Sequence, residues 1–304
     1  MWTPDRLDFN IIRELAGSPS QWNVKKSHAA IAKKLRVDEE TVRNRLRRMK
    51  QEGYLQGWRL IPNPALIGRR AAFLLIGFED SNTKEKAIDK LLHTDGVVVV
   101  AKFYDKTVIV TLFHENGQAQ IAHEIQRTIS AINGNPLTSW NASFPENLQK
   151  LEPLDWEILQ RLMSDPERRL PELARELRIS SRTAKRRINK MMASYAFFLI
   201  PIVNLRKIGG VPCQFIVECA EAKKREADKA IVAKFDEMTF RDIASPTHSV
   251  FGVTCTNIAE GEEIAKWIKT QPGVSTVWLN IVEEPIHSYE WLEKKVKARS
   301  NPTA

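Results

Sequence analysis

This chain of 304 residues contains one short pattern twice. Residues 31–49 read IAKKLRVDEETVRNRLRRM, residues 173–191 read LARELRISSRTAKRRINKM, and the two stretches align without a gap. Each stretch ends in a segment rich in Lys and Arg that favours a helix. A chain that repeats a unit of this kind is expected to fold as two similar halves, so the repeat constrains the architecture before any other feature.

The basic charge is concentrated in these two regions. The formal net charge is +9. Residues 1–62 carry 13 Lys and Arg against 7 Asp and Glu, residues 152–206 carry 11 against 7, and the remainder is neutral to within one charge. Such a distribution is typical of a protein that binds a polyanion through the repeated segments. The alternative is a solvated helix face that happens to be basic.

The apolar spacing predicts helices at matching places in both copies. They are expected over residues 7–15, 29–35 and 38–52, and again over 154–162, 171–177 and 180–192. Residues 54–61 (YLQGWRLI) are predicted to form a hairpin with Gly57 at the bend, which would complete a winged helix-turn-helix. The second copy has YAFFLIPI in this place, without Gly or charge. This apolar segment is therefore expected to be buried or to contact protein.

Each copy is followed by about 80–90 residues of a different type. Strand-like and helix-like stretches alternate there in the order βαββαβ, which is the ferredoxin-like split unit. The predicted fold class is α+β, with two repeats of a winged helix-turn-helix and a ferredoxin-like domain. The expected domains are helix-turn-helix units over 1–62 and 147–203, ferredoxin-like domains over 63–146 and 204–285, and a C-terminal tail over 286–304.

The cysteines and the N-terminus indicate a reducing compartment. Cys213, Cys219 and Cys255 show no CxxC spacing, so a disulfide framework or a zinc finger is not supported, and the three are expected in the core. The first residues, MWTPDRLDFN, do not form a signal peptide, and no apolar run reaches the roughly 18 residues needed to cross a bilayer. We expect a soluble, cytoplasmic protein with no metal site, no cofactor and no membrane partner.

A winged helix followed by a βαββαβ domain resembles the Lrp/AsnC family of prokaryotic transcription regulators. The residues that carry the resemblance are Leu7-Asp8, Thr41-Val42-x-x-Arg45-Leu46, Gly53-Tyr54-Leu55, Leu154-Asp155 and Thr183-Ala184-x-x-Arg187-Ile188. The resemblance implies transcription regulation in a prokaryotic, more specifically archaeal, host, with double-stranded DNA as the partner. It also implies that the two halves pair as an intramolecular pseudo-dimer, and further homo-oligomerisation stays open.

Helix geometry predicts which side chains would contact DNA. With Val42, Leu46 and Met49 facing the core, the opposite side of the third helix faces outward, and the second copy follows the same pattern. The expected DNA-binding residues are Arg43, Asn44, Arg45, Arg47, Arg48, Trp58, Arg59, Arg182, Lys185, Arg186, Arg187, Asn189 and Lys190. Arg can bind guanine and Asn can bind adenine, whereas Lys mostly contacts phosphates. Arg45 and Arg187, nearer the apolar flank, are expected to reach a phosphate and not a base.

The family resemblance also bears on a small-molecule effector. In the family, a turn close to G-x-x-D between the second and third strands of the βαββαβ domain borders a ligand pocket that often takes an amino acid. Here residues 101–105 have Lys102 where glycine is expected and keep only Asp105, and residues 244–248 have neither. An amino-acid effector is therefore not expected. A different small-molecule ligand, or no ligand at all, stays open.

Two other functions stay open as alternatives. Siroheme decarboxylases share this architecture as paired or fused subunits, and such an enzyme would need His and Arg side chains to converge on a large apolar pocket. In this sequence five of the six histidines lie scattered outside the first helix-turn-helix unit: His93, His114, His123, His248 and His287. GxSxG, Walker, HExxH and GxGxxG motifs are also absent from the sequence. We therefore predict a DNA-binding regulator that is not an enzyme, with a decarboxylase or a winged-helix scaffold for protein contacts as alternatives.

Overall fold

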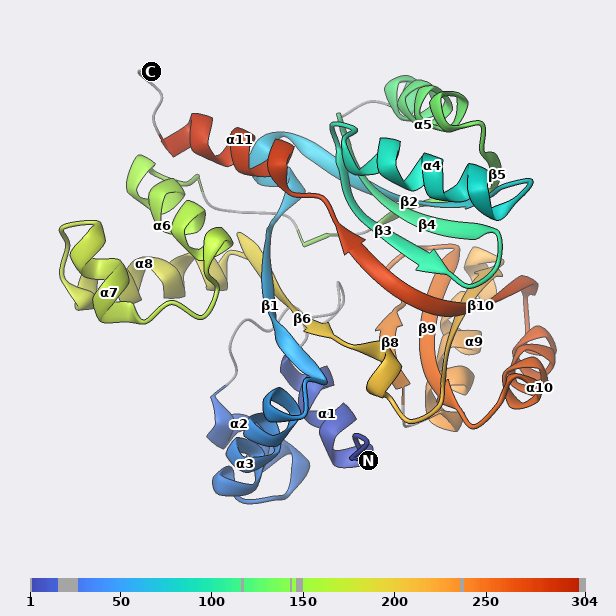
Figure 1. The fold of residues 1–304 in the computed structure, drawn as a ribbon, viewed down its shortest axis with the longest axis horizontal. Helices are drawn as coiled ribbons and strands as arrows, with labels where there is room; N and C mark the ends of the chain where they lie inside the picture. The colour runs from blue at the N-terminus through green and yellow to red at the C-terminus, as the bar shows by residue number, and fades with distance from the viewer. Residues whose placement is uncertain are drawn as a thin grey trace.

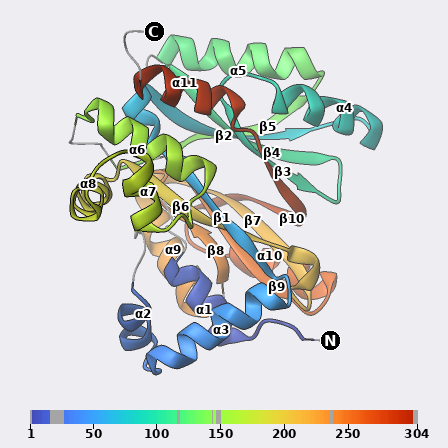
Figure 2. The same ribbon diagram turned by 60° about the vertical axis from the view of Figure 1, so that its left-hand side comes forward.

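The computed structural model describes residues 2–15, 27–115, 118–142, 144–145, 150–235 and 238–300. The first helical head consists of α1 (Arg6–Leu15), α2 (His28–Leu35) and α3 (Glu39–Gln51). The second consists of α6 (Pro153–Ser164), α7 (Leu170–Glu176) and α8 (Ser181–Ala193). Both heads lie on the same side of the sheet domains (Figures 1 and 2).

The helix-turn-helix geometry is the same in both heads. The turn before α3 holds Arg36 at φ 57°, and the turn before α8 holds Arg178 at φ 54°. The side chain of Asp38 accepts a hydrogen bond from the backbone N–H of Thr41, and Ser180 plays the same part for Thr183. Such N-caps satisfy backbone donors that a helix leaves free in its first turn. The prediction of paired helix-turn-helix units is confirmed.

The predicted wing hairpin is wrong. Residues 55–62 form one continuous strand, β1 (Leu55–Pro62), which pairs antiparallel with β6 (Phe197–Val203) of the second repeat. Gly57 lies at an irregularity within this strand and does not turn the chain. The physical reason is that the second copy supplies an apolar strand as a partner, and Phe197, Phe198 and Leu199 are buried as expected. The two segments that would form wings therefore build a ribbon between the repeats.

Both repeats contain the predicted βαββαβ domain, and the α+β fold class is confirmed. In the first repeat its elements are β2 (Arg69–Gly77), α4 (Ser81–Leu92), β3 (Val97–Phe103), β4 (Thr107–Glu115), α5 (Gln118–Ile132) and β5 (Asn135–Ala142). In the second they are β7 (Val211–Cys219), α9 (Glu221–Lys234), β8 (Met238–Asp242), β9 (His248–Cys255), α10 (Ile258–Lys269) and β10 (Val274–His287). Short 3-10 turns, η1 (Pro64–Ile67) and η2 (Leu205–Lys207), connect each head to its domain.

The two domains join into one sheet. Within the described residues it has eight strands in the order β5-β2-β4-β3-β10-β7-β9-β8. The long strand β10 pairs with β7 of its own repeat and with β3 of the other, and Asn280 donates hydrogen bonds to Asp105 and Thr107 across this seam. Farther away, His248 stacks on Trp140 with 4.7 Å between ring centroids. The repeats are thus linked by both backbone and side-chain contacts.

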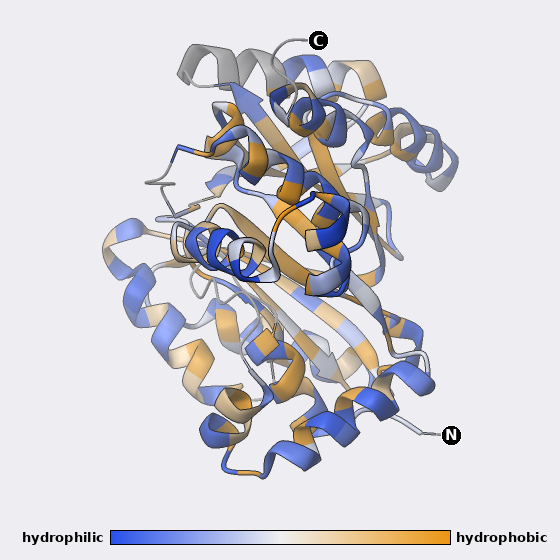
Figure 3. Cartoon of the chain, turned by 90° about the vertical axis from the view of Figure 1, so that its left-hand side faces the viewer, coloured by the Kyte–Doolittle hydropathy of each residue, from blue (hydrophilic) through white to orange (hydrophobic). Residues whose placement is uncertain are grey.

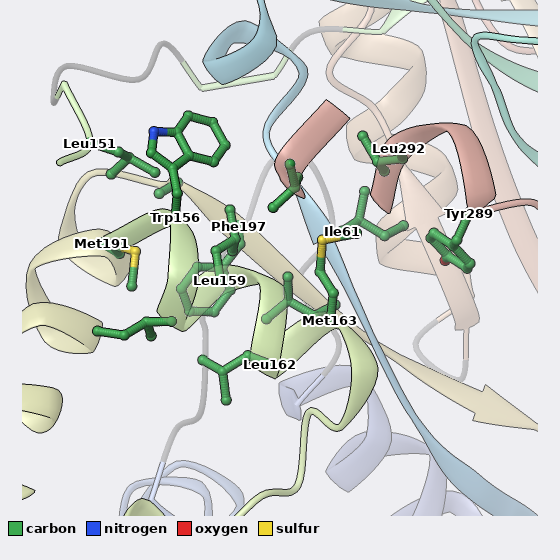
Figure 4. Close-up of a cluster of buried hydrophobic side chains, with 14 of the residues drawn as sticks. Ile61, Leu151, Trp156, Leu159, Leu162, Met163, Met191, Phe197, Tyr289 and Leu292 are labelled. Carbon is green, nitrogen blue, oxygen red and sulfur yellow. The ribbon is translucent and has the colours of Figure 1, made fainter. Parts of the chain in front are cut away.

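The C-terminal segment fixes the second head. Helix α11 (Glu290–Ser300) packs on α6, and the indole Nε1 of Trp291 donates a hydrogen bond to the backbone oxygen of Val97 at 2.6 Å. Leu159 and Met163 of α6 share one apolar core with Ile61 of β1 and with α11 (Figure 4). The second head therefore rests on the first sheet domain.

The first head packs against the second sheet domain. Ile208 belongs to its apolar core, and the backbone N–H of Asn204 donates to the oxygen of Tyr54 at 2.8 Å. Each head thus contacts the sheet domain of the other repeat. The three cysteines are buried, as predicted. Among the described helices, none is long and apolar enough to cross a bilayer.

Candidate nucleic-acid interface

The outer face of α8 is a strongly basic surface. Ala184 and Met191 are buried against the head, which orients the helix. The opposite side exposes Arg182, Lys185, Arg186, Asn189 and Lys190. Helix α8 contains no acidic residue, and within the described part of the chain none of these cations forms an ion pair. Hydrophilic residues dominate the exposed sides of the head helices (Figure 3). This face therefore presents uncompensated positive charge to solvent.

The outer face of α3 carries less free charge. Arg43 binds Glu39 at 2.9 Å and Glu40 at 2.8 Å, both on its own helix. Arg47 donates to Asn44 at 2.7 Å. The exposed Arg48 lies 5.5 Å from the ring centroid of Trp2. The two third helices are thus similar in position but unequal in net charge.

The expected residues Arg45 and Arg187 are partly buried and link the third helix of each head to the first. Arg187 forms ion pairs with Asp155 at 2.9 Å and Glu152 at 2.8 Å. Arg45 forms them with Asp5 at 2.5 Å and the fully buried Asp8 at 3.2 Å. These hydrogen bonds raise the pKa of both arginines. Because both guanidinium groups are engaged, the two residues orient the helices from within.

The acidic partners of these two arginines belong to a motif that occurs in both copies of the sequence. Each arginine binds the Asp of a Leu-Asp pair at the start of a first helix, namely Leu7-Asp8 and Leu154-Asp155. Sequence reasoning noted these pairs without linking them to the arginines. Burial raises the pKa of Asp8, although Arg45 and backbone donors act in the opposite direction.

Trp58 and Arg59 lie in the β1–β6 ribbon instead of a wing. Trp58 is half-buried and packs against the apolar cores of both heads. The guanidinium of Arg59 lies 4.7 Å from the ring centroid of Tyr289, and the Tyr289 hydroxyl is 3.0 Å from Nδ1 of His287. Burial, with the charge of Arg59, lowers the pKa of His287 to about 4. One of the scattered histidines is thus brought together with an arginine and a tyrosine, which sequence reasoning missed.

An ion pair connects the two heads directly. Lys50, near the end of α3, binds Glu167 in the segment before α7. Together with the β1–β6 ribbon, this contact fixes the two third helices relative to each other. Lys50 is consequently less available to a ligand than the cations of α8.

In each repeat a lysine binds backbone oxygens at or just after the end of the second strand of the βαββαβ domain. Lys84 Nζ donates to the backbone oxygens of Phe103 and Asp105 at 2.7 and 2.6 Å. Lys224 Nζ donates to the backbone oxygen of Ile243 at 3.0 Å and to Asp228 at 2.6 Å. Across the described residues, no group of three His, Cys, Asp or Glu side chains could hold a metal ion.

Known proteins resemble the chain both in sequence and in fold. Residues 151–192 match the AsnC-type helix-turn-helix domain. Over 94 residues the chain is 32% identical to the HTH-type transcriptional regulator Ptr1 of Methanocaldococcus jannaschii; this covers 31% of the chain and 60% of that regulator. The chain thus spans less than two thirds of the length of this relative.

Solved structures extend the likeness to the whole fold. The siroheme decarboxylase NirDL, in a complex with an iron-uroporphyrin III analogue, is 14% identical at a TM-score of 0.56 and covers 99% of this chain and 100% of its own. AsnC of E. coli is 20% identical over 50% of this chain and 98% of its own, with a TM-score of 0.30. The chain therefore contains an AsnC-type helix-turn-helix domain, and its resemblance to the Lrp/AsnC family is confirmed, in a tandem form with two units in one chain.

Proposed function

We propose that this protein is a transcription regulator that binds double-stranded DNA through α8 and α3. The observation that carries the proposal is the outer face of α8. It is the third helix of an AsnC-type helix-turn-helix domain, and its exposed Arg182, Lys185, Arg186 and Lys190 form no ion pair among the described residues. Cations without a protein partner can replace the counterions of the phosphate backbone, which supplies most of the affinity for DNA.

The two heads would read DNA unequally. On α3, Glu39 and Glu40 already bind Arg43, so DNA must displace them before Arg43 can contact a phosphate or a base. On α8 no such exchange is needed. We therefore expect α8 to provide the larger part of the affinity, with Asn189 and Arg186 facing base edges and the lysines facing phosphates.

The spacing of the half-sites would be fixed by the protein. The β1–β6 ribbon and the Lys50–Glu167 ion pair link the two heads, and α11 holds the second head on the first sheet domain. Two recognition helices linked in this way suit half-sites about one turn of DNA apart, roughly 34 Å. Because the helices differ in sequence, the preferred site should be asymmetric.

Binding of the full chain to a random-sequence duplex tests the proposal. We expect salt-dependent binding by fluorescence anisotropy, and loss of most of it when Arg182, Lys185, Arg186 and Lys190 are all replaced by Gln. The matched control replaces Lys86 and Lys90 of α4 and Lys266 and Lys269 of α10 by Gln, which removes the same charge from helices of the sheet domains, outside both heads. Equal losses in both variants, or no binding by the unaltered chain at low salt, would contradict the proposal.

A tetrapyrrole-binding enzyme is the second candidate. It is favoured by the cluster of Arg59, His287 and Tyr289, since Arg can bind a carboxylate and His can carry a proton. The fold likeness to NirDL extends over the whole chain. Against it, Tyr289 is only 8% exposed and Arg59 already covers its ring, so a ligand would have to displace packed side chains. Titration with siroheme, followed by absorbance, separates the two candidates.

A further inference from the structure

A cavity runs along α9 beside the end strand β8. Its volume is about 610 Å³, which lies within the range of small-molecule sites. One stripe of α9 from Glu221 to Ala233 forms one wall, and Arg241, Ile243 and Pro246 contribute from β8 and the following turn. The cavity belongs to the second sheet domain, away from the DNA-facing side of α8.

Within the described residues, four cations and two carboxylates line this cavity. Lys224 is paired with Asp228, which in turn accepts from Ser249. Arg225, Lys229 and Arg241 also line the cavity, and none of them forms an ion pair within the described residues. Burial lowers the pKa of Arg241, the positive charge of Arg13 on α1 lowers it further, and the carboxylate of Asp228 acts in the opposite direction. Positive charges gathered around a cavity repel each other until an anion binds between them.

The first repeat provides an internal comparison. Lys84 and Lys224 occupy the same position, the fourth residue of their helices, and both donate to the backbone at the end of the second strand. Counting from them, Arg225 corresponds to Glu85 and Lys229 to Asp89. The charge of the helix face is thus reversed between two copies of the same fold.

The strands beside α4 and α9 also differ, in whether their outer edge is paired. In the first repeat, β10 pairs with β3 and covers its edge, and Lys102 on β3 binds Glu85 at 2.9 Å and Glu283 at 3.3 Å. In the second repeat, β8 ends the sheet, and no described strand pairs with its outer edge. The second repeat therefore combines an open outer edge of β8 with a cationic helix face, whereas in the first repeat β10 pairs with β3 and the matching helix positions are acidic.

We propose that this cavity along α9 binds a small polyanion carrying at least two phosphate or carboxylate groups, held by Arg225, Lys229 and Arg241. Such a ligand would also neutralise the repulsion between Arg241 and Arg13, and Arg13 lies on α1 of the first head. Binding would then tighten the contact between that head and the second sheet domain. The inference goes beyond DNA binding and does not depend on it.

Calorimetric titration of the full chain with pyrophosphate and with citrate tests the site. We expect saturable binding of at least one of them to the unaltered chain, and at least tenfold weaker binding to Arg225→Glu and to Lys229→Asp. Both substitutions introduce the residue type that the first repeat carries on the same fold, so folding should be preserved. Lys86→Glu, an exposed charge reversal on α4, is the control and should bind like the unaltered chain.

Three outcomes would overturn the inference. They are no saturable binding of either anion by the unaltered chain, unchanged binding by Arg225→Glu, and equal weakening by Lys86→Glu. A duplex titration distinguishes phosphates of DNA from those of a free ligand. If Arg225→Glu weakens duplex binding while the unaltered chain ignores pyrophosphate and citrate, the cavity along α9 contacts DNA and the small-ligand site is wrong.

Discussion

The difference between α8 and α3 leads to a quantitative prediction about salt dependence. Replacing Arg186 by Gln removes one exposed cation that has no ion pair among the described residues. Replacing Arg43 by Gln removes a cation that is also exposed but is bound to Glu39 and Glu40. Both changes remove one positive charge from the outer face of a third helix, so they form a matched pair.

The expected magnitudes follow from counterion release. Each phosphate neutralised by a cation contributes a slope of about 0.9 to the fall of log K with log salt. Arg186→Gln should therefore reduce the slope by about 0.9 and weaken binding about fivefold at 0.15 M salt, or about 1 kcal/mol. Arg43→Gln should reduce the slope by less than about 0.3, because two carboxylates already compensate the guanidinium.

Fluorescence anisotropy with one labelled duplex, between 50 and 300 mM potassium acetate, measures both slopes. Circular dichroism of each variant checks that the heads remain folded. Equal slope changes for Arg186→Gln and Arg43→Gln would refute the reasoning, because the ion pairs on α3 would then have no influence on DNA binding. A larger change for Arg43→Gln would assign the main contact to the first head.

Further predictions concern stability. Asp155→Asn removes the buried carboxylate that binds Arg187 and should lower the free energy of unfolding by about 2 kcal/mol. Asp8→Asn should lower it by less, because burial already raises the pKa of Asp8. Urea denaturation of both variants measures the two changes. Trp291→Ala should cost about 3–5 kcal/mol, since the ring is 6% exposed and packs in the core beneath the second head; a loss below 1 kcal/mol would contradict this. Burial lowers the pKa of His287 to about 4, so below pH 6.5 the unfolded chain binds a proton that the folded chain does not. Stability should therefore fall as the pH drops from 6.5 toward 4, and His287→Gln should flatten this dependence in thermal melts.

Local patterns in the sequence predicted most elements of the fold. The third helices and the βαββαβ order depend on apolar residues that recur every three to four positions or every second position within one segment. The caps of α3 and α8 are formed by residues directly before each helix. Such signals need no knowledge of the rest of the chain.

The errors arose where a segment's partner lies far away in the sequence. Residues 54–61 have the composition of a hairpin, but β1 pairs with a strand about 140 residues later. Arg59 and Tyr289 lie even farther apart in the sequence, and the ion pairs of Arg45 and Arg187 also join separate helices. The positive charge along α9 stands out only against the acidic residues at the matching positions of α4, and the structure is needed to match these positions.

Selection of bound sequences from a random duplex pool tests the central claim most directly. The account predicts an enriched, asymmetric motif with two unequal half-sites about one helical turn apart. It also predicts that Arg186→Gln relaxes the sequence preference in the stronger half-site alone. A symmetric motif, or equal relaxation of both half-sites, would contradict the unequal roles of α8 and α3. Absence of any bound sequence at low salt, together with binding of siroheme, would replace the DNA-binding account by the enzymatic one.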